Sequence, residues 1–256
     1  MRRALIVGNW KMNLDHVEAV HLTQQLAVIL ASRPAEHVDV VVAPPFVDLR
    51  SVTSVIEAEH SALQVAAQHV NPRPAGAHTG EIAVPMLARL HVGWVIVGHS
   101  ERRTLYGMDD QTVADTARAA VAGGLRAIVC VGEAEDVRAR STHRAFVEGQ
   151  VAAALGALSA PAGEVVVAYE PIWAIGTGRT ASVADVAEMT GVIRAAVGAT
   201  SLTDVRVLYG GSVTGDNAAE LLAADVDGFL VGGASLRAES FAAIIAAGES
   251  CYAGGR

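Results

Sequence analysis

The stretch Val165-Val166-Val167-Ala168-Tyr169-Glu170 is a short apolar run that ends at a carboxylate. It is mostly Val and does not alternate with polar residues, which is typical of a parallel strand buried on both faces. Seven further runs of this kind are Ala4 to Gly8, Val38 to Ala43, Leu63 to Ala67, Gly93 to Val97, Ala127 to Val131, Val205 to Tyr209 and Gly228 to Val231. Segments with helical periodicity separate the runs. Eight strands that alternate with helices predict a closed barrel or a large open sheet.

Length and composition fit the closed form. A chain of 256 residues is normal for a (β/α)8 barrel. Hydrophobic residues make up 52% and charged residues 18% of the chain, so a large core is available. No stretch is typical of an interdomain linker, and we expect a single domain over residues 1–256. The formal net charge of −8 argues against nucleic acid or an anionic membrane as the main partner.

Cysteine usage bears on the compartment. Cys130 ends an apolar run and Cys251 lies in a Gly/Ala-rich tail, so the pair does not resemble a disulfide framework or a zinc site. The apolar run after Arg3 is too short for a signal peptide, and no run reaches membrane-spanning length. We therefore expect a cytoplasmic protein.

Polar and glycine residues follow several of the predicted strands. In a barrel, the residues just past the carboxyl ends of the strands line the active-site face. Residues that are distant in the sequence would therefore converge there. The residues at these positions are Asn9, Lys11, His99, Ser100, Glu101, Glu170, Gly210, Gly211, Ser212, Gly232 and Gly233.

Three of these side chains suit proton transfer and charge stabilisation. Glu170 at the mouth of an apolar barrel would be partly desolvated, which raises the pKa of a carboxyl towards that of a useful base. His99 precedes a predicted helix start, where backbone N–H groups disfavour the imidazolium ion. Taken singly, a solvated loop glutamate and a structural histidine are the commoner interpretations. Lys11 is the only lysine of the chain, with Glu101 as its plausible partner and Asn9 as a second donor to the same oxygen.

Glycine-rich loops suggest a phosphate site and a lid. Gly210-Gly211-Ser212 and Gly232-Gly233 follow the last two predicted strands, where barrel enzymes commonly bind phosphate. The segment Pro171 to Gly178 has a proline at one end and Gly-Thr-Gly at the other, which suits a rigid tip on short hinges. An ordinary strand–helix loop is the alternative there.

The charged segment Arg138 to Glu148 is expected to be a solvated helix face.

Five motifs carry a resemblance to a known family: VGNWKMN (Val7 to Asn13), VGHSERR (Val97 to Arg103), YEPIWAIGTG (Tyr169 to Gly178), LYGGSV (Leu208 to Val213) and DGFLVGGASL (Asp227 to Leu236). With them, the chain resembles the triosephosphate isomerases over nearly its whole length. The resemblance implies a single-domain TIM barrel and an aldose–ketose isomerase of glycolysis and gluconeogenesis. Its reaction would interconvert D-glyceraldehyde 3-phosphate and dihydroxyacetone phosphate through an enediolate. No metal and no organic cofactor are implied.

The resemblance also assigns catalytic roles. By it, Glu170 abstracts a carbon-bound proton next to the substrate carbonyl. His99, uncharged, polarises that carbonyl and moves protons between the two oxygens. Lys11 and Asn9 stabilise the enediolate and bind substrate, and Glu101 orients Lys11.

The lid and the phosphate grip follow from the same resemblance. The lid consists of Pro171, Ile172, Trp173, Ala174, Ile175, Gly176, Thr177 and Gly178. On closure, the amide of Gly176 would join Ser212, Gly232 and Gly233 on the phosphate. Closure would protect an enediolate that otherwise eliminates phosphate.

A homodimer is the further implication. The loop Ala75 to Glu81 matches the segment that enters the partner subunit in this family, and Thr79 is the expected contact. The chain departs from the family pattern at four positions, which are His69, His78, Met108 and Thr116. Here the family usually has Asn or Asp, an aromatic residue, Glu, and Lys. These departures put dimer stability and substrate preference in question more than activity.

Three alternatives remain at this level. A paralogous isomerase of a four-carbon ketose phosphate (a tetrulose phosphate) would use the same residues. A non-catalytic phosphate-binding barrel is disfavoured by the intact set of Asn9, Lys11, His99 and Glu170. An aldolase would need a Schiff-base lysine on a late strand, whereas the only lysine is Lys11.

Overall fold

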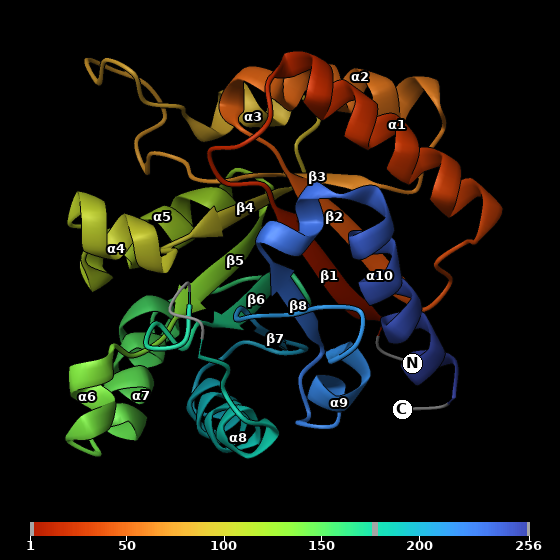
Figure 1. Ribbon diagram of the computed structural model, residues 1–256. Coiled ribbons are helices and arrows are strands. Elements are labelled where there is room, and N and C mark those ends of the chain that lie inside the picture. The colour runs from red at the N-terminus through yellow and green to blue at the C-terminus, as the bar shows by residue number, and fades with distance from the viewer. Residues whose placement is uncertain (1–2, 176–178, 255–256) are drawn as a thin grey trace.

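Eight parallel strands close into one barrel in a computed structural model of the chain, which describes residues 3–175 and 179–254 (Figure 1). Neighbours in the barrel are consecutive in sequence, and the first strand also pairs with the last. The (β/α)8 TIM-barrel fold is therefore confirmed, and the open sheet is excluded. The strands are β1 (Ala4–Asn9), β2 (Val38–Ala43), β3 (Gln64–Ala67), β4 (Trp94–Val97), β5 (Arg126–Val131), β6 (Val165–Tyr169), β7 (Arg206–Tyr209) and β8 (Gly228–Val231).

Helices form a ring around the barrel (Figure 1). Two of the longest begin at a capping box, in which Asp15 pairs with Glu18 and Ser182 pairs with Asp185. The helices are α1 (His16–Ser32), α2 (Leu49–Ala58), α3 (Val84–Arg89), α4 (Ser100–Tyr106), α5 (Asp110–Ala122), α6 (Glu135–Ala139), α7 (His143–Leu155), α8 (Val183–Gly198), α9 (Ala218–Leu222) and α10 (Ala238–Ala253), with short 3-10 turns η1 (Phe46–Asp48) and η2 (Gly233–Leu236). Within the described ranges, none of these helices has the length and apolarity needed to cross a membrane.

Side chains of the strands alternate between two apolar clusters. Leu5 and Val7 point into the barrel, whereas Ala4 and Ile6 pack outwards against the helices. Because both sides of each strand are buried, the strands are continuous apolar runs in the sequence. The cluster inside the barrel consists of Leu5, Val7, Val41, Ala43, Ala66, Trp94, Ile96, Ile128, Cys130, Val166, Ala168, Leu208 and Leu230.

The amino end of the barrel is closed by Trp94. Its indole is fully buried and donates a hydrogen bond from Nε1 to Gln64 at 2.8 Å. The guanidinium groups of Arg126 and Arg206 lie 5.0 and 5.5 Å from the ring centre. Arg206 is held in turn by Asp39 at 2.7 Å. This stack of aromatic and cationic groups forms the floor of the barrel.

Two of the departures from the family pattern are internal. Met108 is buried where the family usually has Glu, and Thr116 is fully buried where it usually has Lys. The Thr116 hydroxyl has no hydrogen-bond partner within the described part of the chain. Both side chains are uncharged, so neither position buries a charge.

The third βα loop extends away from the barrel. Residues 73–81 are exposed, and the loop projects well beyond the neighbouring helices (Figure 1). Thr79 and His78 lie on this projecting segment. Its base is closed by a bridge between Asn71 and Ala83.

Candidate active site

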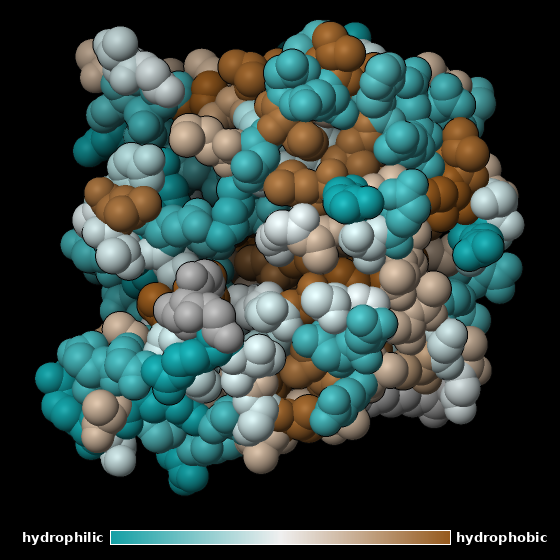
Figure 2. Space-filling model, viewed as in Figure 1, coloured by the Kyte–Doolittle hydropathy of each residue, from teal (hydrophilic) through white to brown (hydrophobic). Residues whose placement is uncertain are grey.

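One pocket of about 370 Å³ opens at the carboxyl ends of the strands. Figure 2 shows this face of the molecule hollowed near its centre. Nine of the eleven residues expected from the strand-end positions line it; Ser100 and Glu101 do not. The lining residues are Asn9, Lys11, His99, Glu170, Ile175, Gly210, Gly211, Ser212, Val213, Thr214, Leu230, Gly232, Gly233 and Ala234.

Glu170 is buried directly after β6, with both carboxylate oxygens engaged. Oε1 lies 2.9 Å from His99 Nε2, and Oε2 accepts the backbone N–H of Ser100 at 2.8 Å. Burial raises the pKa of Glu170, but the charge and hydrogen bond of His99 and the Ser100 amide outweigh it, so the pKa lies below its usual value. The expectation that desolvation would raise the pKa is wrong for this resting arrangement. The carboxylate is ionised and ready to accept a proton.

His99 is fixed in one tautomer by the start of α4. Its Nδ1 accepts the backbone N–H of Glu101 at 3.2 Å, so this nitrogen carries no proton. The remaining ring proton is then on Nε2, which faces Glu170. Burial lowers the pKa of His99, whereas the negative charge of Glu170 raises it above its usual value. The raised pKa therefore depends on the contact with Glu170, and the hydrogen bond at Nδ1 favours the neutral ring once a substrate separates the two side chains.

Lys11 points into the pocket from a strained backbone. Its φ of 54° is in the left-handed region, which side chains other than glycine rarely adopt. The conformation is held by Lys11 N–H donating to Asn9 Oδ1 at 3.1 Å and by Gln68, whose amide donates to the Lys11 carbonyl at 2.8 Å. The ammonium group pairs with Glu101 at 2.6 Å. A compact positive charge is thereby fixed at the mouth of the barrel.

The two glycine-rich loops lie next to this charge. A Cβ at Gly232 would sit 3.7 Å from Cε of Lys11, so the ammonium stem runs past the eighth loop. On the seventh loop, a Cβ at Gly211 would lie 2.2 Å from the Tyr209 hydroxyl, which permits only glycine there. Asn217 ties this loop by donating to the Ser212 carbonyl at 3.1 Å. Two glycine-rich loops and one cation thus line the same pocket, where an anion can bind.

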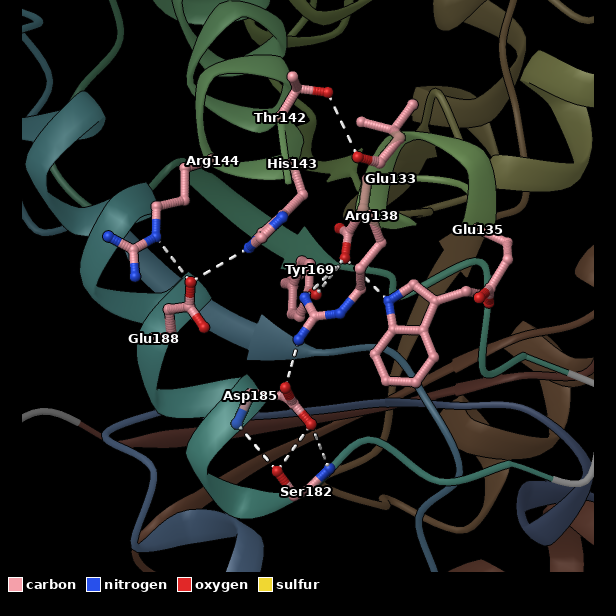
Figure 3. Close-up of polar contacts among 12 residues, drawn as sticks. Glu133, Glu135, Arg138, Thr142, His143, Arg144, Tyr169, Ser182, Asp185 and Glu188 are labelled. Atoms are coloured by element: carbon pink, nitrogen blue, oxygen red, sulfur yellow. Dashed lines mark hydrogen bonds and ion pairs between the residues drawn. The ribbon is translucent and has the colours of Figure 1, made fainter. Parts of the chain in front are cut away.

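The described part of the predicted lid, Pro171 to Ile175, contacts a buried carboxylate, that of Glu133. Trp173 donates from Nε1 to Glu133 at 2.8 Å, and the Tyr169 hydroxyl donates to the same oxygen at 3.0 Å. Arg138 bridges Glu133 and Asp185, and its guanidinium lies 4.7 Å from the centre of the Trp173 ring (Figure 3). The first part of the segment predicted to be a lid is thereby anchored to α6 and α8. The predicted lid residues Gly176, Thr177 and Gly178 lie outside the described residues.

The family model described as "Triosephosphate isomerase" matches residues 4–248. The chain belongs to the triosephosphate isomerase family.

Bacterial triosephosphate isomerases match over almost all of the chain. The protein of that name from Nocardia farcinica is 50% identical over 255 residues, which are 96% of this chain and 98% of the relative. Those from Rhodococcus jostii and Mycobacterium tuberculosis are 48% and 49% identical with the same coverage. Membership of the family therefore extends over the full barrel.

Two residues of this triosephosphate isomerase site escaped the sequence analysis. Gln68 is partly buried and holds the backbone of Lys11, whereas Glu133 is fully buried and holds Trp173 of the predicted lid. Both residues could have been proposed from their positions, because each follows a predicted strand directly or within two residues. Arg138 was also misjudged, since its side chain turns inwards to Glu133 and does not belong to a solvated face.

In residues 3–175 and 179–254, no group of three or more His, Cys, Asp and Glu side chains is arranged to hold a metal ion. The polar side chains that line the triosephosphate isomerase pocket are those of Asn9, Lys11, His99, Glu170, Ser212 and Thr214.

Proposed function

We propose that this chain interconverts D-glyceraldehyde 3-phosphate and dihydroxyacetone phosphate, with Glu170 as the base. The observation that carries the proposal is the pairing of Glu170 with the proton-bearing Nε2 of His99 in a pocket that also presents Lys11. A carboxylate base, a neutral donor and a cation are the groups that proton abstraction next to a carbonyl requires.

Substrate binding replaces the contact between base and imidazole. The carbonyl oxygen takes the place of Glu170 Oε1 at His99 Nε2, and the freed carboxylate faces the adjacent C–H group. Glu170 removes that proton, and the charge that develops on oxygen is stabilised by the Nε2–H of His99 and by the ammonium group of Lys11. His99 donates its Nε2 proton to that oxygen and takes up the proton of the neighbouring hydroxyl group, so one proton moves between the two oxygens. Glu170 then returns its proton to the neighbouring carbon, and the isomerisation needs no external oxidant or reductant.

The phosphate is assigned to the two glycine loops. Amides of Gly232, Gly233 and Ser212 would bind it, with Lys11 beside them. Gly176 is assigned to the same group from the sequence alone. Held at one end by phosphate, the substrate presents its carbonyl to Asn9, Lys11 and His99 and its C–H group to Glu170.

The three-carbon substrate is favoured over a tetrulose phosphate. The curated relatives from three bacterial genera all carry the name triosephosphate isomerase at 48–50% identity. An assay coupled to dihydroxyacetone phosphate formation tests the proposal directly. A higher kcat/KM with a four-carbon ketose phosphate would refute it.

Substitution of the base tests the role of Glu170. Glu170→Asp withdraws the carboxylate by about one carbon–carbon bond, and a misplacement of about 1 Å costs about 10²-fold in rate. We expect kcat to fall by about 10²-fold or more while inorganic phosphate binds as before. Unchanged turnover would refute the assignment.

We further propose a homodimer in which Thr79 enters the partner subunit. A second pocket of about 380 Å³ adjoins Lys11, and its exposed apolar rim includes Met12, Leu105 and Tyr106. The projecting loop of residues 73–81 is long enough to leave its own barrel, which supports an exchange of loops. Sedimentation should give a mass of twice 26.4 kDa, and Thr79→Arg should yield a monomer with reduced activity. A fully active wild-type monomer would contradict the proposal.

We propose two further properties, a location and a domain assignment. Cys130 and Cys251 are both free thiols, which supports a cytoplasmic location for the enzyme. We also assign residues 1–256 to one isomerase domain, supported by the closure of the barrel between β1 and β8. Cell fractionation and a single cooperative unfolding transition are the corresponding tests.

A further inference from the structure

The loop after β5 packs directly against the main chain of Glu170. A Cβ at Gly132 would lie 1.8 Å from the Glu170 carbonyl oxygen and 2.7 Å from its carbonyl carbon. The Glu170 N–H donates to the Val131 carbonyl at 2.8 Å. Because no side chain separates the two backbones, any shift of Gly132 is transmitted to the base.

Gln150 of α7 fixes Gly132 from the outside of the barrel. Its Oε1 accepts the Gly132 N–H at 2.8 Å, and the side chain is buried. Gly132 lies just past the end of β5, where strand pairing no longer satisfies its amide. Without the Gln150 oxygen, this buried N–H would lose its partner, which is expensive in a packed loop.

We propose that Gln150 is a positioning residue for proton abstraction, acting through Gly132 on the placement of the Glu170 carboxylate. The inference rests on the proposed role of Glu170 as the base. Gln150 itself is outside the pocket lining and has no part in the proton transfer.

The geometry at the carboxylate leaves little tolerance. Both oxygens of Glu170 make contacts of 2.8–2.9 Å, with the Ser100 amide and with His99. On the opposite flank lies Gly210, where an added Cβ would come within 3.1 Å of Cγ of Glu170, so only glycine leaves this space to the base. Because both carboxylate oxygens are held by donors at fixed positions, a movement of the Gly132 loop would displace the carboxylate from them.

The same loop also leads to the lid. Glu133 follows Gly132 and holds Trp173, and its carbonyl accepts the Ile172 N–H at 3.1 Å. Gln150 fixes Gly132, and Gly132 contacts the main chain of Glu170 and precedes Glu133. Gln150 therefore supports the base and also the residue that holds the predicted lid. Substrate binding depends mainly on the loops after β7 and β8, which are distant in sequence from this loop. Loss of the hydrogen bond between Gln150 and Gly132 should therefore change kcat more than KM.

The test compares Gln150→Leu with Gln150→Glu. Leucine has a similar size but no acceptor, and we expect kcat to fall by about tenfold or more, with KM within about twofold of wild type. The acid limb of the kcat/KM profile should also move to higher pH, because a displaced Glu170 loses the donors that lower its pKa. Glutamate retains an acceptor oxygen and should keep kcat within about threefold.

Thr190→Val is the matched control. Thr190 is buried in α8 and its hydroxyl donates to the Val186 carbonyl at 2.8 Å, so the variant loses one internal hydrogen bond away from the Gly132 loop. Its kcat and pH profile should be those of wild type. If Gln150→Leu does not fold, Gln150→Asn, whose amide is one methylene too short to reach Gly132, should show the same loss and the same shift in pH profile.

The outcomes distinguish a failure of the proposed isomerase function from a failure of the positioning role of Gln150. Wild-type protein without isomerase activity would refute the proposed function. Active wild type together with a Gln150→Leu (or, in its place, Gln150→Asn) variant of unchanged kcat and pH profile would refute only the positioning role. Equal losses in Gln150→Glu and Gln150→Leu, or equal losses in Thr190→Val and Gln150→Leu, would also overturn it.

Discussion

Replacing Lys11 by Met removes the positive charge of the side chain and keeps an unbranched apolar chain of similar length. Met retains an unbranched chain beside Gly232 but removes the ammonium group that pairs with Glu101 at 2.6 Å. The left-handed φ of residue 11 strains Lys and Met alike, so the backbone cost is the same in both proteins. The comparison thus reports on the positive charge.

The structure predicts a small effect on stability and a large one on catalysis. The Lys11 and Glu101 side chains are 30% and 45% exposed, and such ion pairs contribute about 0–1 kcal/mol. In the closed site, a charge-assisted hydrogen bond contributes about 1.5–3 kcal/mol, and Lys11 is placed to reach both the reacting oxygen and the phosphate. We therefore expect kcat/KM to fall by about 10²–10⁴-fold.

Two measurements check this prediction. Initial rates from the coupled assay give kcat/KM, and urea unfolding gives the free energy of unfolding for the same preparations. Glu101→Gln is the control, because it removes the partner of Lys11 and leaves the ammonium group in place. If Lys11→Met lost more than about 2 kcal/mol of stability but kept activity within threefold, Lys11 would be a structural residue and the assignment would be wrong.

Three further predictions concern stability. Met108→Glu places a carboxylate at a buried position, so the free energy of unfolding, measured in urea, should fall by about 3 kcal/mol; an unchanged value would contradict the buried position of Met108. Trp94→Leu removes the ring from the floor of the barrel and should cost about 2–3 kcal/mol with kcat within twofold, whereas a large loss of kcat would show that the floor influences the site. Because its contacts lower the pKa of Glu170 below the usual 4.5, the ionised group stabilises the fold above pH 4.5, and this contribution is lost as the pH falls through the folded-state pKa. Glu170→Gln should therefore reduce the loss of stability measured between pH 6 and pH 4, and an identical loss in both proteins would refute the direction of the shift.

The barrel could be predicted from the sequence because the interior of each strand is apolar on both faces. The strand starts were less accurate. Gln64, Arg126 and Arg206 begin β3, β5 and β7, with Arg126 outside the predicted run. Their polar side chains pack on Trp94 at the floor, and a polar residue at a strand end gives no sign of such packing.

The candidate site was predictable as a set of residues but not as an arrangement. Strand-end positions brought Asn9, Lys11, His99 and Glu170 together correctly. The lowered pKa of Glu170 depends on the distance to His99, which no spacing in the sequence encodes. Gln150 was missed for a similar reason, since its role depends on one hydrogen bond across the wall of the barrel.

The floor formed by Trp94 and its arginines has a kinetic consequence. Because the interior is filled with side chains down to this stack, the pocket has a single mouth on the carboxyl side. Aldose and ketose phosphate must then enter and leave by the same route, and one bound molecule blocks the other. Inhibition of either direction by its product should be purely competitive, and every turnover must end with an emptied pocket.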